Sequence, residues 1–207
     1  MTRHIVRGLT LIELLIVITL IAVLSALATE NYLLAVTRAK VARTLTDHRT
    51  LATAIEAYTV DHNSPPRMAH KRYGSAEFDI IAGQPVAGVM SKVLSTPTAY
   101  ITEAFLIDPF MVTYKKAPLD ERMYTYQVLD IYAAWNPDSK FWPSAREFYG
   151  AWRIGGVGPD QAFDHLFVNS AQLPYDPTNG VISMGNIWTS QRGAGGLPPI
   201  PDLLAEH

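Results

Sequence analysis

An unbroken apolar run near the N-terminus constrains this chain more than any other feature. Residues 9–28 read LTLIELLIVITLIAVLSALA, and Glu13 is the only charged side chain among these twenty residues. At a rise of 1.5 Å per residue, a helix of this length spans about 30 Å, which matches the hydrocarbon thickness of a bilayer. The run therefore predicts a membrane-spanning helix.

The charges that flank the apolar run predict its orientation. Arg3 and Arg7 precede it, with His4 between them, and the next basic residue is Arg38. Because basic flanking residues stay on the cytoplasmic side, the N-terminus is expected in the cytoplasm and the rest of the chain on the outer side. A cleaved secretory signal is an alternative, since residues 26–28 resemble an A-x-A cleavage site, but such a signal has an apolar region of only 7–15 residues. A second alternative is a plain membrane anchor, but an anchor gives no reason for the ionisable Glu13 within the span.

A short motif leads into the apolar run. Gly8 is followed by Leu9-Thr10-Leu11-Ile12-Glu13, and this pattern resembles the N-terminal signature of type IV prepilins and type II secretion pseudopilins. The resemblance implies that a prepilin peptidase cleaves between Gly8 and Leu9 and methylates the new terminal amine. It also implies that Glu13 pairs with the terminal ammonium of a neighbouring subunit, which would fix the axial register of otherwise featureless helices. The chain departs from the pattern at Glu30, near which many members carry a proline.

Helical periodicity continues beyond the membrane to about His62. Charged residues fall largely to one side, and apolar residues recur at spacings of three, four and seven to form a predicted buried stripe: Leu34, Val41, Leu45, Ala52, Ile55 and Tyr58. Residues 63–66 (NSPP) should end the helix, because proline cannot donate to the helical ladder. His48 lies near the stripe and is expected to be a hydrogen-bonded, partly buried residue rather than a ligand or catalytic group.

The rest of the chain carries strand and loop patterns. Residues 123–129 and 147–154 alternate in polarity, which predicts two half-buried strands, and the turn-forming residues between them favour an antiparallel pair. Further expectations are a third strand at 181–184, a helical piece around 86–94, a turn at 106–110 and a loop-like tail at 193–201. The predicted fold class is therefore α+β, with a long N-terminal helix packed on a small antiparallel sheet in a pilin-like manner.

These patterns divide the chain into four segments. Residues 1–8 are expected to form a basic leader peptide, and residues 9–29 a transmembrane or filament-core helix. Residues 30–62 are expected to form the amphipathic half of the helix. Residues 63–207 are expected to form a periplasmic globular α+β domain with a loop-rich C-terminus.

The composition argues against an enzyme and against nucleic-acid binding. The net charge is −2, and the only dense basic patch lies at the extreme N-terminus, so the body offers no cationic surface to phosphates. Cysteine is absent, which excludes thiol nucleophiles and Cys-ligated zinc. The sequence contains no G-x-S-x-G, H-E-x-x-H or P-loop motif. The glycines of residues 155–158 lack the strand-then-helix context of a dinucleotide site and are expected to form a simple loop. No cofactor is therefore expected to be required.

Three late aspartates form a candidate metal site. Asp160, Asp164 and Asp176 lie in segments of loop composition, and carboxylates from irregular loops suit calcium. Residues 155–160 and 175–180 also resemble the C-terminal loops of the major pseudopilin of type II secretion, and that resemblance implies a calcium site. Turn formation is the alternative, because Asp176 precedes Pro177 and aspartate commonly starts turns.

The resemblance implies a structural subunit of a type II secretion pseudopilus or a related type IV pilus-like filament, most like the major pseudopilin. The implied partners are other copies of the chain, minor pseudopilins, the prepilin peptidase, and an inner-membrane assembly platform with its ATPase. The subunit would cross the inner membrane once, with its C-terminal domain in the periplasm, and then enter a periplasmic or surface filament. The alternatives are a type IV pilin for adhesion or motility, and a membrane-anchored periplasmic enzyme or binding protein.

Overall fold

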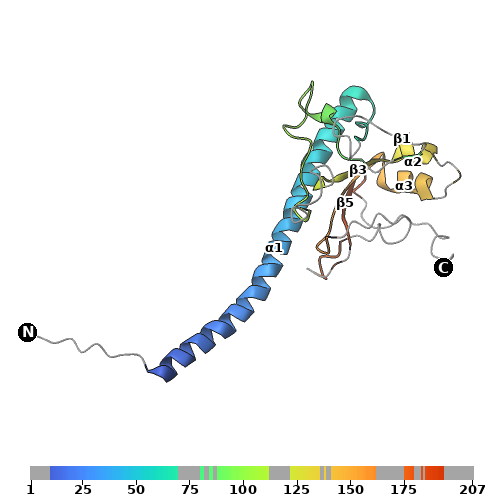
Figure 1. Cartoon of the computed structure of the whole chain (residues 1–207). Helices are drawn as coiled ribbons and strands as arrows, with labels where there is room; N and C mark the ends of the chain where they lie inside the picture. Colours follow the sequence, from blue (N-terminus) through green and yellow to red (C-terminus); the bar gives the residue numbers. More distant parts are fainter. Residues whose placement is uncertain are drawn as a thin grey trace, which may run out of the picture.

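One long helix projects from a small mixed body in the computed structural model of the chain (Figure 1). The structure describes residues 10–69, 80–81, 84–85, 88–111, 122–135, 138, 141–161, 175–179, 183 and 185–193. The C-terminal half of the helix lies against the body, and its N-terminal half stands clear of it. The predicted combination of a long N-terminal helix with a small antiparallel sheet is confirmed.

The long helix, α1, runs from Leu11 to His62 and contains 52 residues. It ends where the sequence predicts, since Asn63 adopts the left-handed conformation with a φ of 56° and closes the helix. Asparagine tolerates this conformation better than most residues, and the prolines at 65 and 66 prevent further helical hydrogen bonding. The two halves of α1 are therefore one continuous element.

The face of α1 that packs on the body differs in part from the predicted stripe. The residues buried on it recur at spacings of three and four: Val41, Thr44, His48, Leu51 and Ile55. Val41 and Ile55 belong to the prediction, whereas Leu45 is 37% exposed and was wrongly placed on that face. The buried face passes through two polar residues, Thr44 and His48, and a search for apolar periodicity alone could not identify them.

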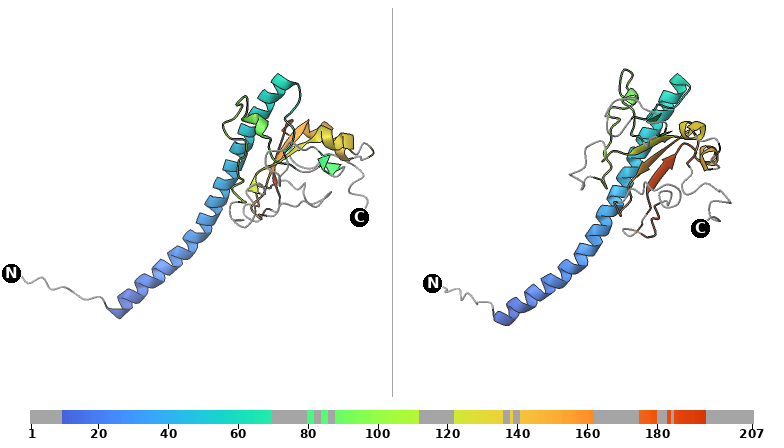
Figure 2. Two further views of the ribbon diagram at one scale, coloured as in Figure 1. Left: turned by 45° about the horizontal axis from the view of Figure 1, so that its top comes forward. Right: turned by 45° about the vertical axis from the view of Figure 1, so that its right-hand side comes forward.

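The sheet contains three short antiparallel strands in the order β3-β4-β5 (Figure 2). They are β3 (Thr125–Val128), β4 (Trp152–Gly156) and β5 (Ile187–Ser190). Tyr126 pairs with Ile154, and Ile154 pairs with Thr189 on the other side. The predicted antiparallel pairing of the segments around 123–129 and 147–154 is confirmed, while Gly155 and Gly156 belong to a strand rather than to the loop that the sequence indicated.

Two helices connect β3 to β4, where the sequence predicted only a turn. They are α2 (Leu129–Trp135) and α3 (Phe141–Tyr149). Residues 147–149 are therefore helical, and the strand predicted from 147 begins only at Trp152. The helical spacing of Ala145 and Tyr149, which are buried against Leu129, prevails over the alternation in polarity. Gly150 then reverses the chain with a φ of 94°, a conformation that favours glycine.

The third strand also differs from its predicted position. β5 occupies residues 187–190, not 181–184. Of the predicted span, only Ser183 is described, and it is not in a strand. The tail expected at residues 193–201 lies almost wholly outside the described residues.

Described residues between α1 and β3 extend the sheet through isolated bridges. Gly88 bridges to Tyr126, and Val89 bridges to Ala69. A two-residue pairing joins β1 (Ile80–Ile81) and β2 (Gln84–Pro85). Of the helix expected around 86–94, residues 88–94 are described, and among them the short 3-10 helix η1 (Lys92–Leu94) is the helical part.

The turn predicted at 106–110 is confirmed. The Asp108 carboxylate accepts hydrogen bonds from the backbone N–H of Phe110, at 2.8 Å, and of Val157, at 2.6 Å. Asp108 therefore ties this turn to the end of β4. Its side chain is buried, and burial raises the pKa of its carboxyl group to about 6.

Side-chain hydrogen bonds fix α1 against the sheet. The Trp152 indole Nε1–H of β4 donates to Glu56 Oε1 of α1 at 2.8 Å, and Gln191 Nε2 donates to the same oxygen at 3.1 Å. The Tyr126 hydroxyl donates to the Pro66 carbonyl at 3.0 Å. Around these bonds lies the main apolar core, which includes Leu51, Ile55, Tyr126, Trp152 and Ile154.

His48 lies at the centre of this contact. It is fully buried, its Nδ1 is 3.0 Å from Thr189 Oγ1 of β5, and its ring meets the Tyr124 ring edge to face at 4.7 Å. Burial lowers the pKa of His48 to about 3, so the imidazole stays neutral in the folded protein at neutral pH. The expected structural role of His48 agrees with this geometry.

We predict that His48 and Asp108 give the free energy of unfolding opposite pH dependences. As the pH falls from about 7, the unfolded chain protonates His48 near its usual pKa of about 6.5 while the folded state does not, so stability is lost at up to about 1.4 kcal/mol per pH unit. Asp108 has the opposite effect on the free energy of unfolding. The folded state binds the Asp108 proton near pH 6 and the unfolded state only near pH 4, so this group adds stability as the pH falls from about 6 to 4.

Thermal melts of the full-length protein in detergent between pH 7.5 and 4 test this prediction. His48→Gln, which keeps an amide within reach of Thr189, should remove most of the loss of melting temperature between pH 7 and 6. Asp108→Asn should steepen the loss between pH 6 and 4. Parallel melting curves for the parent and His48→Gln proteins over the whole range would contradict it.

Candidate functional site: the N-terminal motif and the C-terminal loops

The first turn of α1 is closed by a reciprocal pair of hydrogen bonds between Thr10 and Glu13. Thr10 is the N-cap residue, in extended conformation, and its Oγ1 accepts from the Glu13 backbone N–H at 3.3 Å. Glu13 Oε2 accepts from the Thr10 N–H at 2.8 Å and from its hydroxyl at 2.7 Å. This is a capping box, which satisfies backbone donors that a helix start otherwise leaves unpaired.

The capping role of Thr10 was missed by the sequence analysis, although the spacing T-x-x-E signals it. The capping box holds the Glu13 side chain against Thr10 within the single chain. Its other oxygen, Oε1, accepts no hydrogen bond from the residues that the structure describes. Gly8 and Leu9, the predicted processing site, lie outside the described residues.

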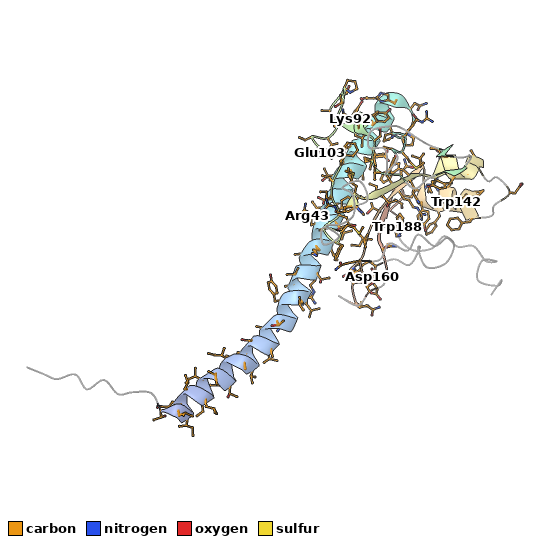
Figure 3. All side chains as sticks on the ribbon, viewed as in Figure 1. Arg43, Lys92, Glu103, Trp142, Asp160 and Trp188 are labelled. Atoms are coloured by element: carbon orange, nitrogen blue, oxygen red, sulfur yellow. The ribbon has the colours of Figure 1, made fainter. Side chains whose placement is uncertain are left out.

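The N-terminal half of α1 is apolar on all sides and is covered by no described part of the chain. Between Leu11 and Leu27, its large apolar side chains are all at least 46% exposed. Figure 3 shows these side chains standing free along the helix. By its length and composition, α1 is apolar enough to cross a membrane.

Two hydroxyl groups in this half are satisfied within the helix itself. The Thr19 hydroxyl donates to the Leu15 carbonyl at 2.7 Å, and the Thr29 hydroxyl donates to the Ser25 carbonyl at 2.8 Å. Because unpaired polar groups are costly in hydrocarbon, these bonds make the surface suitable for lipid or for another apolar helix.

The helix and the sheet together make a mixed α+β fold consistent with that of pilins. Within this fold, residues 3–29 match the prokaryotic N-terminal methylation motif, the signature of type IV prepilin-like proteins. The match includes Gly8, Leu9 and Glu13, but does not distinguish a major pseudopilin from other types of pilin. Comparisons with curated proteins and with solved structures gave no match.

Two of the three predicted calcium ligands lie in loops that meet on one segment of the chain. Asp160 is exposed in the turn after β4, and a β-carbon on the nearby Gly158 would lie 2.1 Å from the Gly185 carbonyl oxygen, so only glycine allows this close approach. Asp176 lies beside the same segment, since its N–H donates to Ser183 Oγ at 3.0 Å. Figure 3 places Asp160 at the end of the body nearer the N-terminal half of α1. Asp164 lies outside the described residues.

The local contacts of Asp176 agree with the alternative of turn formation. Asp176 Oδ1 accepts from the Thr178 N–H at 2.8 Å and from its hydroxyl at 2.6 Å, and these bonds lower the pKa of the carboxyl group. No group of three histidine, aspartate or glutamate residues positioned to hold a metal ion occurs within the described ranges.

One polar atom in this region is compatible with the calcium prediction. Asn186, which precedes β5, is 1% exposed, and its side-chain oxygen Oδ1 has no hydrogen-bond partner among the residues that the structure describes. Asn186 is joined to the loop of Asp176, because the Tyr175 N–H donates to its backbone carbonyl at 2.9 Å, and a neutral amide oxygen is a suitable ligand for calcium. The described residues do not bring a calcium site together, and calcium binding stays a prediction.

We predict that calcium stabilises the C-terminal loops. Binding to the folded state alone would raise the free energy of unfolding by about 2.7 kcal/mol at a hundredfold excess over Kd. Melting temperatures of the full-length protein in detergent, with calcium and with a chelator, measure this gain. Asp176→Asn should abolish it while keeping the turn, because asparagine can accept the same bonds from Thr178. An unchanged melting temperature on chelation would eliminate the calcium site.

Proposed function

We propose that this chain is a structural subunit of a type II secretion pseudopilus or a related type IV pilus-like filament. The observation that carries the proposal is the apolar half of α1, which bears the methylation motif, projects from the body and is exposed on every side. So large an apolar surface requires lipid or other apolar helices around it. A bilayer provides the lipid, and a filament of repeated copies provides the other apolar helices.

In this proposal the subunit first spans the inner membrane once, with its C-terminal domain in the periplasm. A prepilin peptidase removes residues 1–8, and an assembly platform with its ATPase transfers the helix from lipid into the filament. Other copies and minor pseudopilins are then the partners of residues 9–29. The role is mechanical rather than catalytic, because adding subunits extends the filament.

Glu13 supplies the specificity that apolar surfaces lack. Neighbouring apolar helices can slide past one another at little cost, whereas a carboxylate pairs with one cation at one position. The partner is the ammonium of the new N-terminus at Leu9 in a neighbouring subunit, and methylation leaves its positive charge. Glu13 Oε2 is engaged with Thr10, which supports Oε1 as the oxygen that accepts from this ammonium.

We predict cleavage between Gly8 and Leu9. Mass spectrometry of the protein recovered from membranes should give an N-terminal methylated Leu9, and Gly8→Leu should leave the leader attached. A chain beginning at Thr29 would instead establish cleavage by an ordinary signal peptidase, and the filament proposal would then be wrong.

We predict that Glu13→Ala inserts into the membrane and is cleaved after Gly8, yet enters filaments poorly when it is the only copy in the cell. Removing one partner of a buried charge pair costs about 3–5 kcal/mol, which weakens subunit association at least a hundredfold. Crosslinking of whole cells should then show monomer and few multimers.

Glu13→Gln is the matched variant for this experiment, because glutamine can still complete the capping box with Thr10 but carries no charge. If the charge pair sets the register, Glu13→Gln should assemble as poorly as Glu13→Ala. Normal multimers with Glu13→Gln and few with Glu13→Ala would assign Glu13 to helix capping alone. Normal multimers with both variants would show that Glu13 does not set the register between subunits.

A further inference from the structure

Two apolar side chains of α1 lie above the proposed membrane span and are not covered by the body. Tyr32 is 67% exposed and Leu33 is 56% exposed. They continue the exposed apolar surface of the N-terminal half after an interruption at residues 29–31. Among the described residues of α1, Val41 is the first that is buried, and it packs with Phe110, Val157 and Ile187. Leu34, Val36 and Thr37 are already half-buried, so the cover of α1 begins just after Leu33.

The polar interruption does not require a water layer around Thr29 and Asn31. The Thr29 hydroxyl donates to the Ser25 carbonyl at 2.8 Å, and Asn31 Nδ2 donates to the Leu27 carbonyl at 3.2 Å. Both side chains thus turn back onto their own helix. This arrangement suits the boundary between hydrocarbon and headgroups, where some polar groups must be satisfied within the protein.

The position of the two residues along the helix matches one layer of a bilayer. If Ala28 marks the end of the hydrocarbon, Tyr32 and Leu33 lie about 6–8 Å above it at the standard helical rise. The headgroup layer extends about 5–8 Å beyond the hydrocarbon on each side. Tyrosine is enriched in this layer because its ring is apolar and its hydroxyl is polar.

The distribution of apolar side chains around the helix favours lipid over a single protein face. Tyr32 and Leu33 are successive residues and point about 100° apart on the helix, and the apolar residues below them occupy all sides. A partner helix would require one continuous stripe, whereas surrounding lipid contacts the whole circumference.

We propose that Tyr32 and Leu33 form a lipid-contacting belt in the outer headgroup layer, which holds the unassembled subunit at one depth in the membrane. The belt rests on the proposed insertion of residues 9–29. It assigns to residues 32 and 33 a contact with phospholipid that must be broken when the subunit leaves the membrane.

The absence of cysteine from the chain allows a direct test with single spin labels. Leu20→Cys, Leu33→Cys and Ala42→Cys, each in the full-length chain, are labelled and placed in phosphatidylethanolamine–phosphatidylglycerol vesicles at low protein density. Leu20 lies within the span, and Ala42 is an exposed residue of the same helix beside the body. Collision rates with oxygen and with a water-soluble nickel chelate give the depth of each label.

We expect the oxygen-to-nickel collision ratio, which rises with depth in the membrane, to be highest at position 20, intermediate at 33 and lowest at 42. In the Leu33→Cys protein, a second change of Tyr32→Ser should lower the ratio at position 33, and Tyr32→Trp should restore it, because tryptophan prefers the same layer.

Three results would overturn the belt. A ratio at position 33 equal to that at 42, with position 20 deep, would place Tyr32 and Leu33 in water while leaving membrane insertion intact. Protection of position 33 from both reagents would show a covering protein surface, such as a second copy. A shallow label at position 20 would show that the helix does not insert, in which case the proposed function fails as well.

Discussion

The packing of one half of a single helix against a short sheet is the interaction on which the rest of this molecule depends. Strands of four and five residues provide little surface of their own, so the sheet is completed by the buried face of α1. Glu56 links the helix to β4 through Trp152 and to the following turn through Gln191. Because α1 continues past this contact as one helix and leaves the body, its apolar half is exposed and has to find its cover elsewhere (Figure 1).

The sequence predicted those features that local chemistry decides. Glycine before an apolar run predicted the motif, Asn63 and the prolines predicted the end of α1, and alternation predicted β3. It was less successful where tertiary packing decides. Residues 147–149 alternate like a strand but are helical, because Ala145 and Tyr149 fill a pocket of apolar side chains around Leu129. For His48 the sequence predicted a partly buried, hydrogen-bonded residue, but it could not identify the partner, Thr189, which lies on a strand 141 residues away in sequence.

The candidate sites divide in the same way. Glu13 was identified from sequence because a lone carboxylate in an apolar run is conspicuous, but its contact with Thr10 required the geometry of the helix start. The aspartates were grouped from their place in loops. The structure shows that the loops of Asp160 and Asp176 both contact the segment before β5, a convergence created by the close approach of Gly158 and Gly185. No pattern in the sequence indicates that approach.

The continuity of α1 also makes the molecule a lever. Leu11 and Val41 are thirty residues apart on one continuous helix, a path of about 45 Å along its axis at the standard rise. Tilting the helix by about 10° at Val41 would displace its far end by roughly 8 Å, which is close to the distance between the axes of two packed helices. Neighbours that hold the N-terminal ends to within a side chain's width would therefore fix the angle of each body to a few degrees. Small changes in the seating of His48 against β5 would conversely be amplified at the opposite end of the rod.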